Sequence, residues 1–150
     1  MKINDQISVL IIKSEREMTE SREIRQVVFV EEQQVAPEIE YDQYEDTSTH
    51  VLARIGNKAV GTARWRKTDQ GFKLERFAVL NSTRGKGVGL ALVNFVLDQI
   101  GDKFKSYLYS QVSAIGFYEK LGFKAEGEIF YEADIPHRKM VYRPESIIRL

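Results

Sequence analysis

The sequence VLNSTRGKGVG, residues 79–89, joins an apolar, strand-like segment to a segment with helical periodicity. Three glycines, at 85, 87 and 89, let the backbone adopt positive φ angles and approach a ligand closely. The unpaired N–H groups and the dipole at the start of a helix attract anions, and Arg84 and Lys86 add full positive charges. The segment therefore predicts a binding site for phosphate or pyrophosphate.

Two common phosphate-binding patterns do not fit this segment. A P-loop needs Gly-Lys-Ser/Thr after four spacer residues, and that triplet is missing. The dinucleotide fingerprint needs G-x-G-x-x-G in the first βαβ unit, whereas here G-x-G-x-G lies in mid-chain. The alternative is a tight turn with incidental glycines, but a glycine inside the first helical turn costs roughly 1 kcal/mol unless something requires it.

The chain before this segment predicts strands and one long helix. Residues 3–12 are apolar and β-branched and predict a strand, and Ser14 with Glu17 forms a capping box for a helix that ends near residue 29 or 30. Residues 31–48 lack a clean period and predict a loop with one helical turn. Three further strands are predicted over residues 50–55, 59–65 and 72–80.

One irregularity and one regular pattern flank the glycine-rich segment. The alternation of apolar residues slips between Leu74 and Phe77, as a β-bulge would produce. The helix after the glycines carries its apolar residues at helical spacing and ends at Gly101: these are Val88, Leu92, Phe95, Val96 and Ile100.

The C-terminal third predicts a strand, a short helix and a hairpin. The strand covers residues 104–109, the helix 113–121, and the hairpin pairs 123–131 with 139–142 around Pro136. Strands interleaved with helices around a central antiparallel meander predict an α/β fold with a mixed sheet and helices on its faces. The absence of linkers and repeats predicts a single domain over residues 1–150.

Composition excludes several classes of protein. The 150 residues include no cysteine and only two histidines, which argues against disulfides, thiolate metal sites, a cysteine nucleophile and a metal cofactor. Apolar runs are short and the N-terminus lacks a signal-peptide pattern, so a cytoplasmic protein without a membrane partner is expected. The zero net charge argues against nucleic acid as a partner.

The zero net charge hides an asymmetry along the chain. Residues 1–50 hold five Lys/Arg and twelve Asp/Glu, a net charge of −7, and residues 51–150 carry +7. Chance explains such a split in a mixed surface, but two unlike partners explain it too. The basic part contains the predicted phosphate site.

Two motifs resemble the GNAT superfamily of N-acetyltransferases. Arg84-x-x-Gly87-x-Gly89 is similar to the Gln/Arg-x-x-Gly-x-Gly/Ala signature of that family, and residues 111–123, QVSAIGFYEKLGF, resemble a second signature at the family spacing. The resemblance covers roughly residues 22–142. The segments 25–33 and 127–137 look like those of a bacterial subgroup with unassigned substrates.

The resemblance implies a fold and a co-substrate. The fold has three layers, with a twisted, mostly antiparallel sheet splayed between the fourth and fifth strands and helices on both faces. The gap admits acetyl-coenzyme A, and a backbone N–H near Phe77 polarises the acetyl carbonyl. The residues implied in binding the coenzyme are Phe77, Ala78, Val79, Arg84, Gly85, Lys86, Gly87, Val88, Gly89, Gln111, Ala114 and Phe117.

The resemblance also implies an N-acetyltransferase that joins the acetyl group to a primary amine by direct attack. Tyr118 matches the family's tyrosine general acid, with packing on the helix face as the alternative. Glu75 and His137 are candidate general bases, because a carboxylate or an imidazole can accept the amine proton. Glu128, Glu132 and an unassisted neutral amine are further options, and His50 is expected to be structural.

The acceptor and the partners are left open. The acidic residues 31–46 fall where the family builds its acceptor site and suit a cationic small molecule or peptide, with an ordinary solvated loop as the alternative. Trp65, Tyr41 and Tyr44 are candidates for the same pocket. A non-catalytic acyl-coenzyme A sensor and an acyl-homoserine-lactone-synthase-like enzyme are the competing functions, and the final hairpin allows a homodimer.

Overall fold

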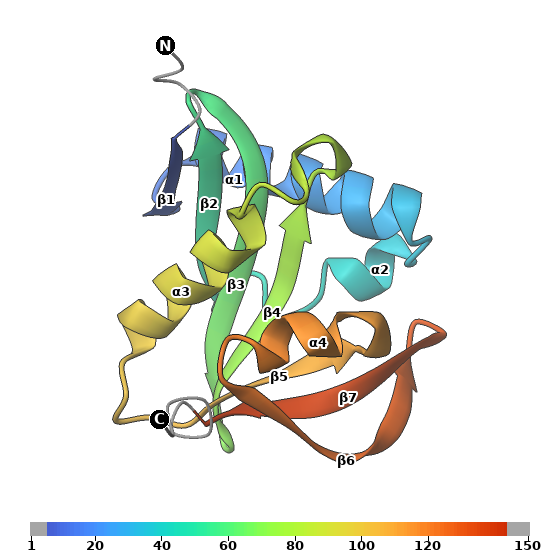
Figure 1. The fold of residues 1–150 in the computed structure, drawn as a ribbon. Helices are drawn as coiled ribbons and strands as arrows, with labels where there is room; N and C mark the ends of the chain where they lie inside the picture. The colour runs from blue at the N-terminus through green and yellow to red at the C-terminus, as the bar shows by residue number, and fades with distance from the viewer. Residues whose placement is uncertain (1–5, 144–150) are drawn as a thin grey trace.

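The computed structural model describes residues 6–143, and within them the strands form one sheet in the order β1-β2-β3-β4-β5-β7-β6 (Figure 1). The strands are β1 (Ile7–Ile11), β2 (Thr49–Ile55), β3 (Lys58–Thr68), β4 (Gly71–Val79), β5 (Ser106–Gln111), β6 (Phe123–Glu132) and β7 (Ile135–Tyr142). The helical elements are α1 (Glu15–Arg25), η2 (Gln26–Glu32), α2 (Pro37–Glu40), η3 (Asn81–Thr83), α3 (Val88–Ile100), η4 (Val112–Ala114) and α4 (Ile115–Glu119). The predicted strand residues 3–5 lie outside the described range.

Helices cover both faces of the sheet. In Figure 1, α3 and α4 lie on the near face and α1 passes behind β2 and β3. The near layer packs Leu92 and Val96 of α3 against buried strand residues such as Leu74. On the far face, Ile24 of α1 and Val28 pack against buried β2 and β4 side chains. The predicted three-layer α/β fold is therefore confirmed, with burial of apolar area on each face supplying most of its stability.

The sheet opens between β4 and β5. These two strands pair in parallel only from Phe72 opposite Ser106 to Leu74 opposite Leu108, and all other neighbours are antiparallel. Beyond Leu74 the two strands diverge, as Figure 1 shows. The predicted splay between the fourth and fifth strands is confirmed, and it leaves the ends of both strands free to line a cleft.

A β-bulge shapes the free end of β4. The β3–β4 register shifts between Thr62 and Arg64, because β4 contributes one extra residue there. Arg76 adopts a left-handed conformation with φ 61° at this point. The slip in the sequence pattern between Leu74 and Phe77 is therefore a real bulge, and it turns the following backbone toward the gap.

Two glycines let α3 begin close to the sheet. A Cβ on Gly61 of β3 would lie 2.8 Å from a Val88 side-chain carbon, so only glycine allows this approach. Gly87, the residue that precedes α3, adopts φ 91°, which glycine tolerates without strain. The start of α3 is therefore fixed over β3 and beside the gap.

Two local features differ from the sequence-based prediction, and a third agrees with it. The first helix does not end at residues 29–30 but continues as the π-helix η2 to Glu32, since tertiary contacts of Val28 hold the extra turn. The predicted helical turn in the acidic segment is α2. The last hairpin turns at Ala133 and Asp134, both with positive φ, so Pro136 lies within β7 opposite Tyr131 rather than at the turn.

Candidate active site

A cleft of about 700 Å³ fills the gap between β4 and β5. It gathers almost all residues that the sequence associates with the coenzyme: Phe77, Ala78, Val79, Arg84, Gly85, Gly87, Val88, Gly89, Gln111, Ala114 and Phe117. Glu75, Tyr118 and His137 line it as well. Lys86 is exposed and outside the lining, because it lies on the solvent side of the loop.

The glycine-rich loop forms one end of the cleft. Gly85 and Gly87 have φ angles of 81° and 91°, and a Cβ on Gly89 would lie 3.3 Å from the Phe117 ring. No side chain caps the first turn of α3. The helix therefore presents its first N–H groups and the positive end of its dipole to the cleft, an arrangement suited to a pyrophosphate.

Arg84 is held by the protein itself. Its Nε donates to the Val79 carbonyl at 2.9 Å, and its two Nη atoms donate to the Glu32 carboxylate at 3.0 and 2.9 Å. Gln33, the next residue, accepts a 2.8 Å hydrogen bond from Gln111. The end of η2 is thus tied to both sides of the cleft, a contact that the sequence could not reveal because the partners lie 52 and 78 residues apart.

Tyr118 lies in an aromatic part of the cleft. Its ring makes edge-on contacts with Phe77, Phe117 and Phe123 at centroid distances of 6.2, 5.0 and 5.8 Å. Burial raises the pKa of the phenol, which keeps the proton on its oxygen at neutral pH. The Tyr118 side chain therefore both packs against neighbouring aromatic rings and lines the cleft.

His137 lies on β7, where it is nearly buried and stacks on the Phe130 ring with a centroid distance of 5.9 Å. Its Nδ1 lies 2.7 Å from the Ile135 carbonyl oxygen, which can only accept a hydrogen bond. In the neutral imidazole Nδ1 therefore carries the proton and Nε2 has a free lone pair. His137 lines the cleft and can accept a proton at Nε2.

Glu75 is surrounded by cations. Its carboxylate lies 2.5 Å from Arg66 Nε, 3.4 Å from Arg64, 3.7 Å from Lys73 and 3.8 Å from Arg76. Burial works to raise the pKa of Glu75, but these cations outweigh it and hold the pKa below its usual range. A carboxylate stabilised in this way is a weak proton acceptor.

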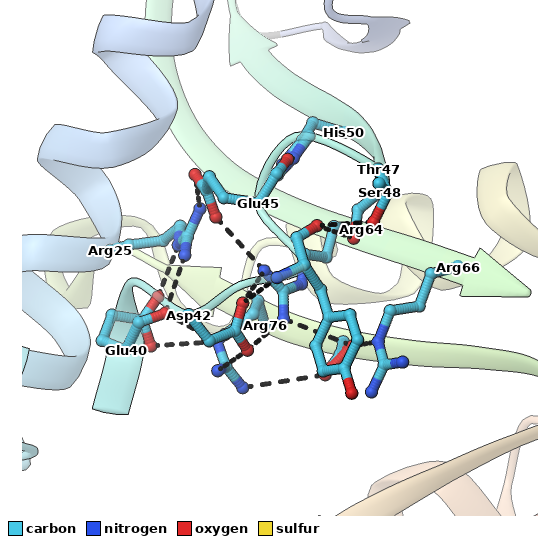
Figure 2. Close-up of polar contacts among 12 residues, drawn as sticks. Arg25, Glu40, Asp42, Glu45, Thr47, Ser48, His50, Arg64, Arg66 and Arg76 are labelled. Atoms are coloured by element: carbon cyan, nitrogen blue, oxygen red, sulfur yellow. Dashed lines mark hydrogen bonds and ion pairs between the residues drawn. The ribbon is translucent and has the colours of Figure 1, made fainter. Parts of the chain in front are cut away.

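Carboxylates of the acidic segment form ion pairs with arginines of the same protein (Figure 2). Glu40 binds Arg25 and Arg76, Asp42 binds Arg64 and Arg76, and Glu45 binds Arg22, Arg25 and Arg64. Arg25 and Arg64 are almost completely buried. These three carboxylates therefore fasten residues 37–48 to α1 and the sheet, and are not free to attract a cationic acceptor.

Several side chains have roles that differ from the sequence-based expectation. Trp65 packs against the core, Tyr41 hydrogen-bonds to α1 and Tyr44 stacks on Arg66, so none of the three lines the cleft. His50 is structural as expected: it is buried, its Nε2 lies 2.8 Å from the Glu45 carbonyl, and burial lowers its pKa.

Glu128 and Glu132 line a separate groove of about 450 Å³ on the last hairpin, and Glu132 also borders the main cleft. The sequence reasoning missed Lys73, Arg76 and Gln33, which line the cleft. For Arg76, the slip in alternation is a usable signal, because the extra residue of a bulge changes the direction of its side chain.

Comparisons with known proteins agree with this geometry. The family model described as an acetyltransferase (GNAT) domain matches residues 15–144. An uncharacterized N-acetyltransferase of Bacillus subtilis strain 168, YjcF, is 37% identical over 138 residues, which cover 90% of this chain and 99% of the relative. The chain belongs to the GNAT family of acetyltransferases.

Solved structures show the same fold. Escherichia coli ElaA superposes with a TM-score of 0.83 and 26% identity, covering 92% of this chain and all of ElaA. A GNAT acetyltransferase from Elizabethkingia anophelis, solved with acetyl-CoA bound, has a TM-score of 0.65 and 18% identity over 91% of this chain and 95% of its own. Within residues 6–143, no helix is long and apolar enough to cross a membrane.

Proposed function

We propose that this protein is an N-acetyltransferase that moves an acetyl group from acetyl-coenzyme A to a primary amine of a small molecule or peptide. The observation that carries the proposal is one cleft that joins the glycine-rich loop, the bulged end of β4 and Tyr118. A non-catalytic sensor would need the loop but not an ordered tyrosine in the same cleft. Family membership supports the acyltransferase class.

In this proposal the coenzyme lies along the cleft with its pyrophosphate at the glycine-rich loop and its thioester at the bulge. The pyrophosphate binds at the first turn of α3, where Gly85 and Gly87 expose backbone N–H groups and Arg84 and Lys86 supply positive charge. The pantetheine arm lies between Val79 of β4 and Gln111 of β5, beyond the last paired residues of these strands. The thioester then reaches the bulge, where a backbone N–H near Phe77 donates to the developing oxyanion.

The reaction is an acyl transfer from sulfur to nitrogen. The neutral amine attacks the thioester carbonyl carbon, a C–N bond forms, and the carbonyl electrons move to oxygen as a tetrahedral intermediate. The C–S bond then breaks and the intermediate collapses to the amide. The amine loses one proton to a base, and the departing thiolate gains one proton from an acid.

Tyr118 and His137 suit the two proton transfers. The buried Tyr118 phenol is protonated at neutral pH and lies in the aromatic part of the cleft, so it acts as the acid toward the thiolate. When the imidazole of His137 is neutral, Nδ1 holds the proton that it donates to the Ile135 carbonyl, and Nε2 acts as the base. Glu75, the other candidate base, is better explained as the anion that neutralises the surrounding arginines.

The test is turnover of acetyl-coenzyme A against a panel of primary amines, followed by release of free thiol. Thiol release that depends on the amine, with a matching acetylated product by mass spectrometry, supports the proposal. Tight binding of coenzyme A without turnover of any amine contradicts it and favours a sensor.

A further inference from the structure

Lys73 of β4 is a cation in the cleft with too little negative charge around it. Its side chain is 14% exposed, and its Nζ lies 4.2 Å from the centre of the Tyr109 ring. The nearest carboxylate within the described residues is Glu75, at 3.7 Å. Glu132 also borders the cleft but makes no ion pair with Lys73 there.

The charges around Glu75 do not balance. The connected ion pairs hold six cations, Arg22, Arg25, Arg64, Arg66, Lys73 and Arg76, and four carboxylates, Glu40, Asp42, Glu45 and Glu75. The network therefore has an excess of two positive charges. Arg25, Arg64, Arg66 and Arg76 each have a carboxylate within 3.1 Å.

The excess falls on the two cations with the longest contacts, Arg22 at 3.6 Å and Lys73 at 3.7 Å. Arg22 is 45% exposed, so water solvates its charge. Lys73 is largely buried, and a buried charge is costly unless an anion pairs with it. Burial, together with the charges of Arg66 and Arg76, lowers the pKa of Lys73 despite the carboxylates of Glu75 and Glu132, which agrees with insufficient compensation.

The strand register makes the arrangement still less favourable without a ligand. Arg66 of β3 lies directly opposite Lys73 of β4, and like charges in such cross-strand positions repel each other. The one carboxylate of Glu75 pairs with both Arg66 and Lys73. An anion from outside the protein would relieve this repulsion, and the cleft gives it access to Lys73.

We propose that the acceptor amine also carries an anionic group, a carboxylate in the simplest case, and that Lys73 binds this group. The acceptor class is then amino acids and related amines, and Lys73 determines specificity without taking part in the chemistry. Lys73 lies in the paired part of β4, opposite Tyr107 at the closed end of the gap, and the bulge at Arg76 follows it toward the proposed thioester position. This inference rests on the proposed acetyl transfer.

The experiment compares amines in matched pairs, with and without the negative charge. β-Alanine, γ-aminobutyrate and L-phenylalanine are each assayed against their carboxamides, using wild type, Lys73→Met and Lys73→Arg. In wild type we expect at least one acid to exceed its amide in kcat/KM by about 10- to 100-fold. Lys73→Met abolishes this preference by raising the KM of the acid, with kcat almost unchanged. Lys73→Arg, which keeps the positive charge, retains the preference.

Two controls separate the inference from the proposed function. Lys67→Met removes an exposed lysine of β3 and should leave the preference intact. Calorimetric titration of the same acids into the protein loaded with coenzyme A needs no turnover. Binding of an acid that is lost in Lys73→Met shows that Lys73 holds the anion even if acetyl transfer, and with it the proposed function, fails. Amides used or bound as well as acids, or a preference that survives Lys73→Met, overturns it.

Discussion

At the residue scale, the aromatic contacts of Tyr118 predict that loss of its hydroxyl group lowers kcat without weakening the binding of coenzyme A. Tyr118→Phe keeps the ring that contacts Phe77, Phe117 and Phe123 and removes only the hydroxyl group. We expect kcat to fall about 100-fold or more, the usual contribution of a general acid, while the dissociation constant of coenzyme A stays the same. Steady-state kinetics and calorimetry measure the two quantities.

Tyr131→Phe is the matched control, since Tyr131 is exposed on the hairpin and does not line the cleft. Its kcat should equal that of wild type. A Tyr118→Phe protein that retains full kcat would assign this tyrosine to packing alone.

The Glu32–Arg84 pair predicts an increase in affinity on loss of a carboxylate. Glu32 occupies both Nη atoms of Arg84, so an incoming pyrophosphate must compete with it. Exposed ion pairs are worth about 0.2–1 kcal/mol, so Glu32→Gln should tighten coenzyme A binding by about 1.4- to fivefold. Arg84→Ala should weaken it.

Glu31→Gln, an exposed neighbour, controls for the general loss of negative charge. Weaker binding in both Glu32→Gln and Arg84→Ala would instead make the pair a brace for the loop, with the pyrophosphate held by backbone N–H groups and Lys86.

The sequence predicts the residues of the loop and not their partners, for a physical reason. Glycine spacing and helical periodicity are local, so Gly85, Gly87 and the start of α3 follow from a few neighbouring residues. The partners of Arg84 and Glu75 come from strands and helices distant in sequence. Their pairing depends on the tertiary fold, and a single sequence holds no record of it.

At the scale of elements, the junction between β4 and α3 predicts a strict need for glycine at position 87. Gly87→Ala would place a Cβ 3.8 Å from Ile7, an ordinary contact, so the cost comes from the left-handed backbone. We expect a loss of about 1–2 kcal/mol in the free energy of unfolding and weaker coenzyme A binding. Urea unfolding and calorimetry measure these effects.

Gly116→Ala is the contrasting variant, because Gly116 lies in helix α4 with open space around its Cβ position and no positive φ. It should be neutral or stabilising by up to about 1 kcal/mol. Equal destabilisation in both variants would mean that the special conformation of Gly87 has no energetic consequence.

The elements themselves follow the sequence to different degrees. The amphipathic pattern fixes α3 at residues 88–100, as predicted, because its apolar stripe and terminal Gly101 agree. The last hairpin is less well predicted, since Pro136 suggests a turn whereas Ala133 and Asp134 supply the positive φ angles that a tight turn needs. Pro136 is the second residue of β7, close to the beginning of the strand, where a residue without an N–H is tolerated.

At the scale of the whole molecule, the asymmetry of charge along the chain is largely neutralised by ion pairs within the protein. Carboxylates of the acidic N-terminal part pair with Arg64 and Arg76 of the basic part, as well as with arginines of α1. Much of the negative charge of residues 1–50 is therefore paired with positive charge of residues 51–150. What is left over is positive charge in the cleft, which suits an anionic coenzyme and an anionic group on the acceptor.

The same network predicts how stability depends on pH. Burial works to raise the pKa values of Asp42, Glu45 and Glu75, but the arginines hold all three below the ordinary range. Groups with a lower pKa in the folded state stabilise it fully above the unfolded pKa of about 4, and lose this contribution as the pH falls through the folded value. We therefore expect the midpoint of urea unfolding to fall steeply as the pH drops below about 5.

Glu45→Gln tests whether the network causes this dependence. The substitution leaves Arg25 and Arg64 without one of their carboxylates, so at pH 7 it should cost about 3 kcal/mol, as for other broken buried pairs. The difference from wild type should shrink in acid, where the wild-type carboxylate also becomes neutral. Glu23→Gln, on the exposed face of α1, should match wild type at every pH. A Glu45→Gln curve parallel to the wild-type curve would show that acid unfolding originates elsewhere.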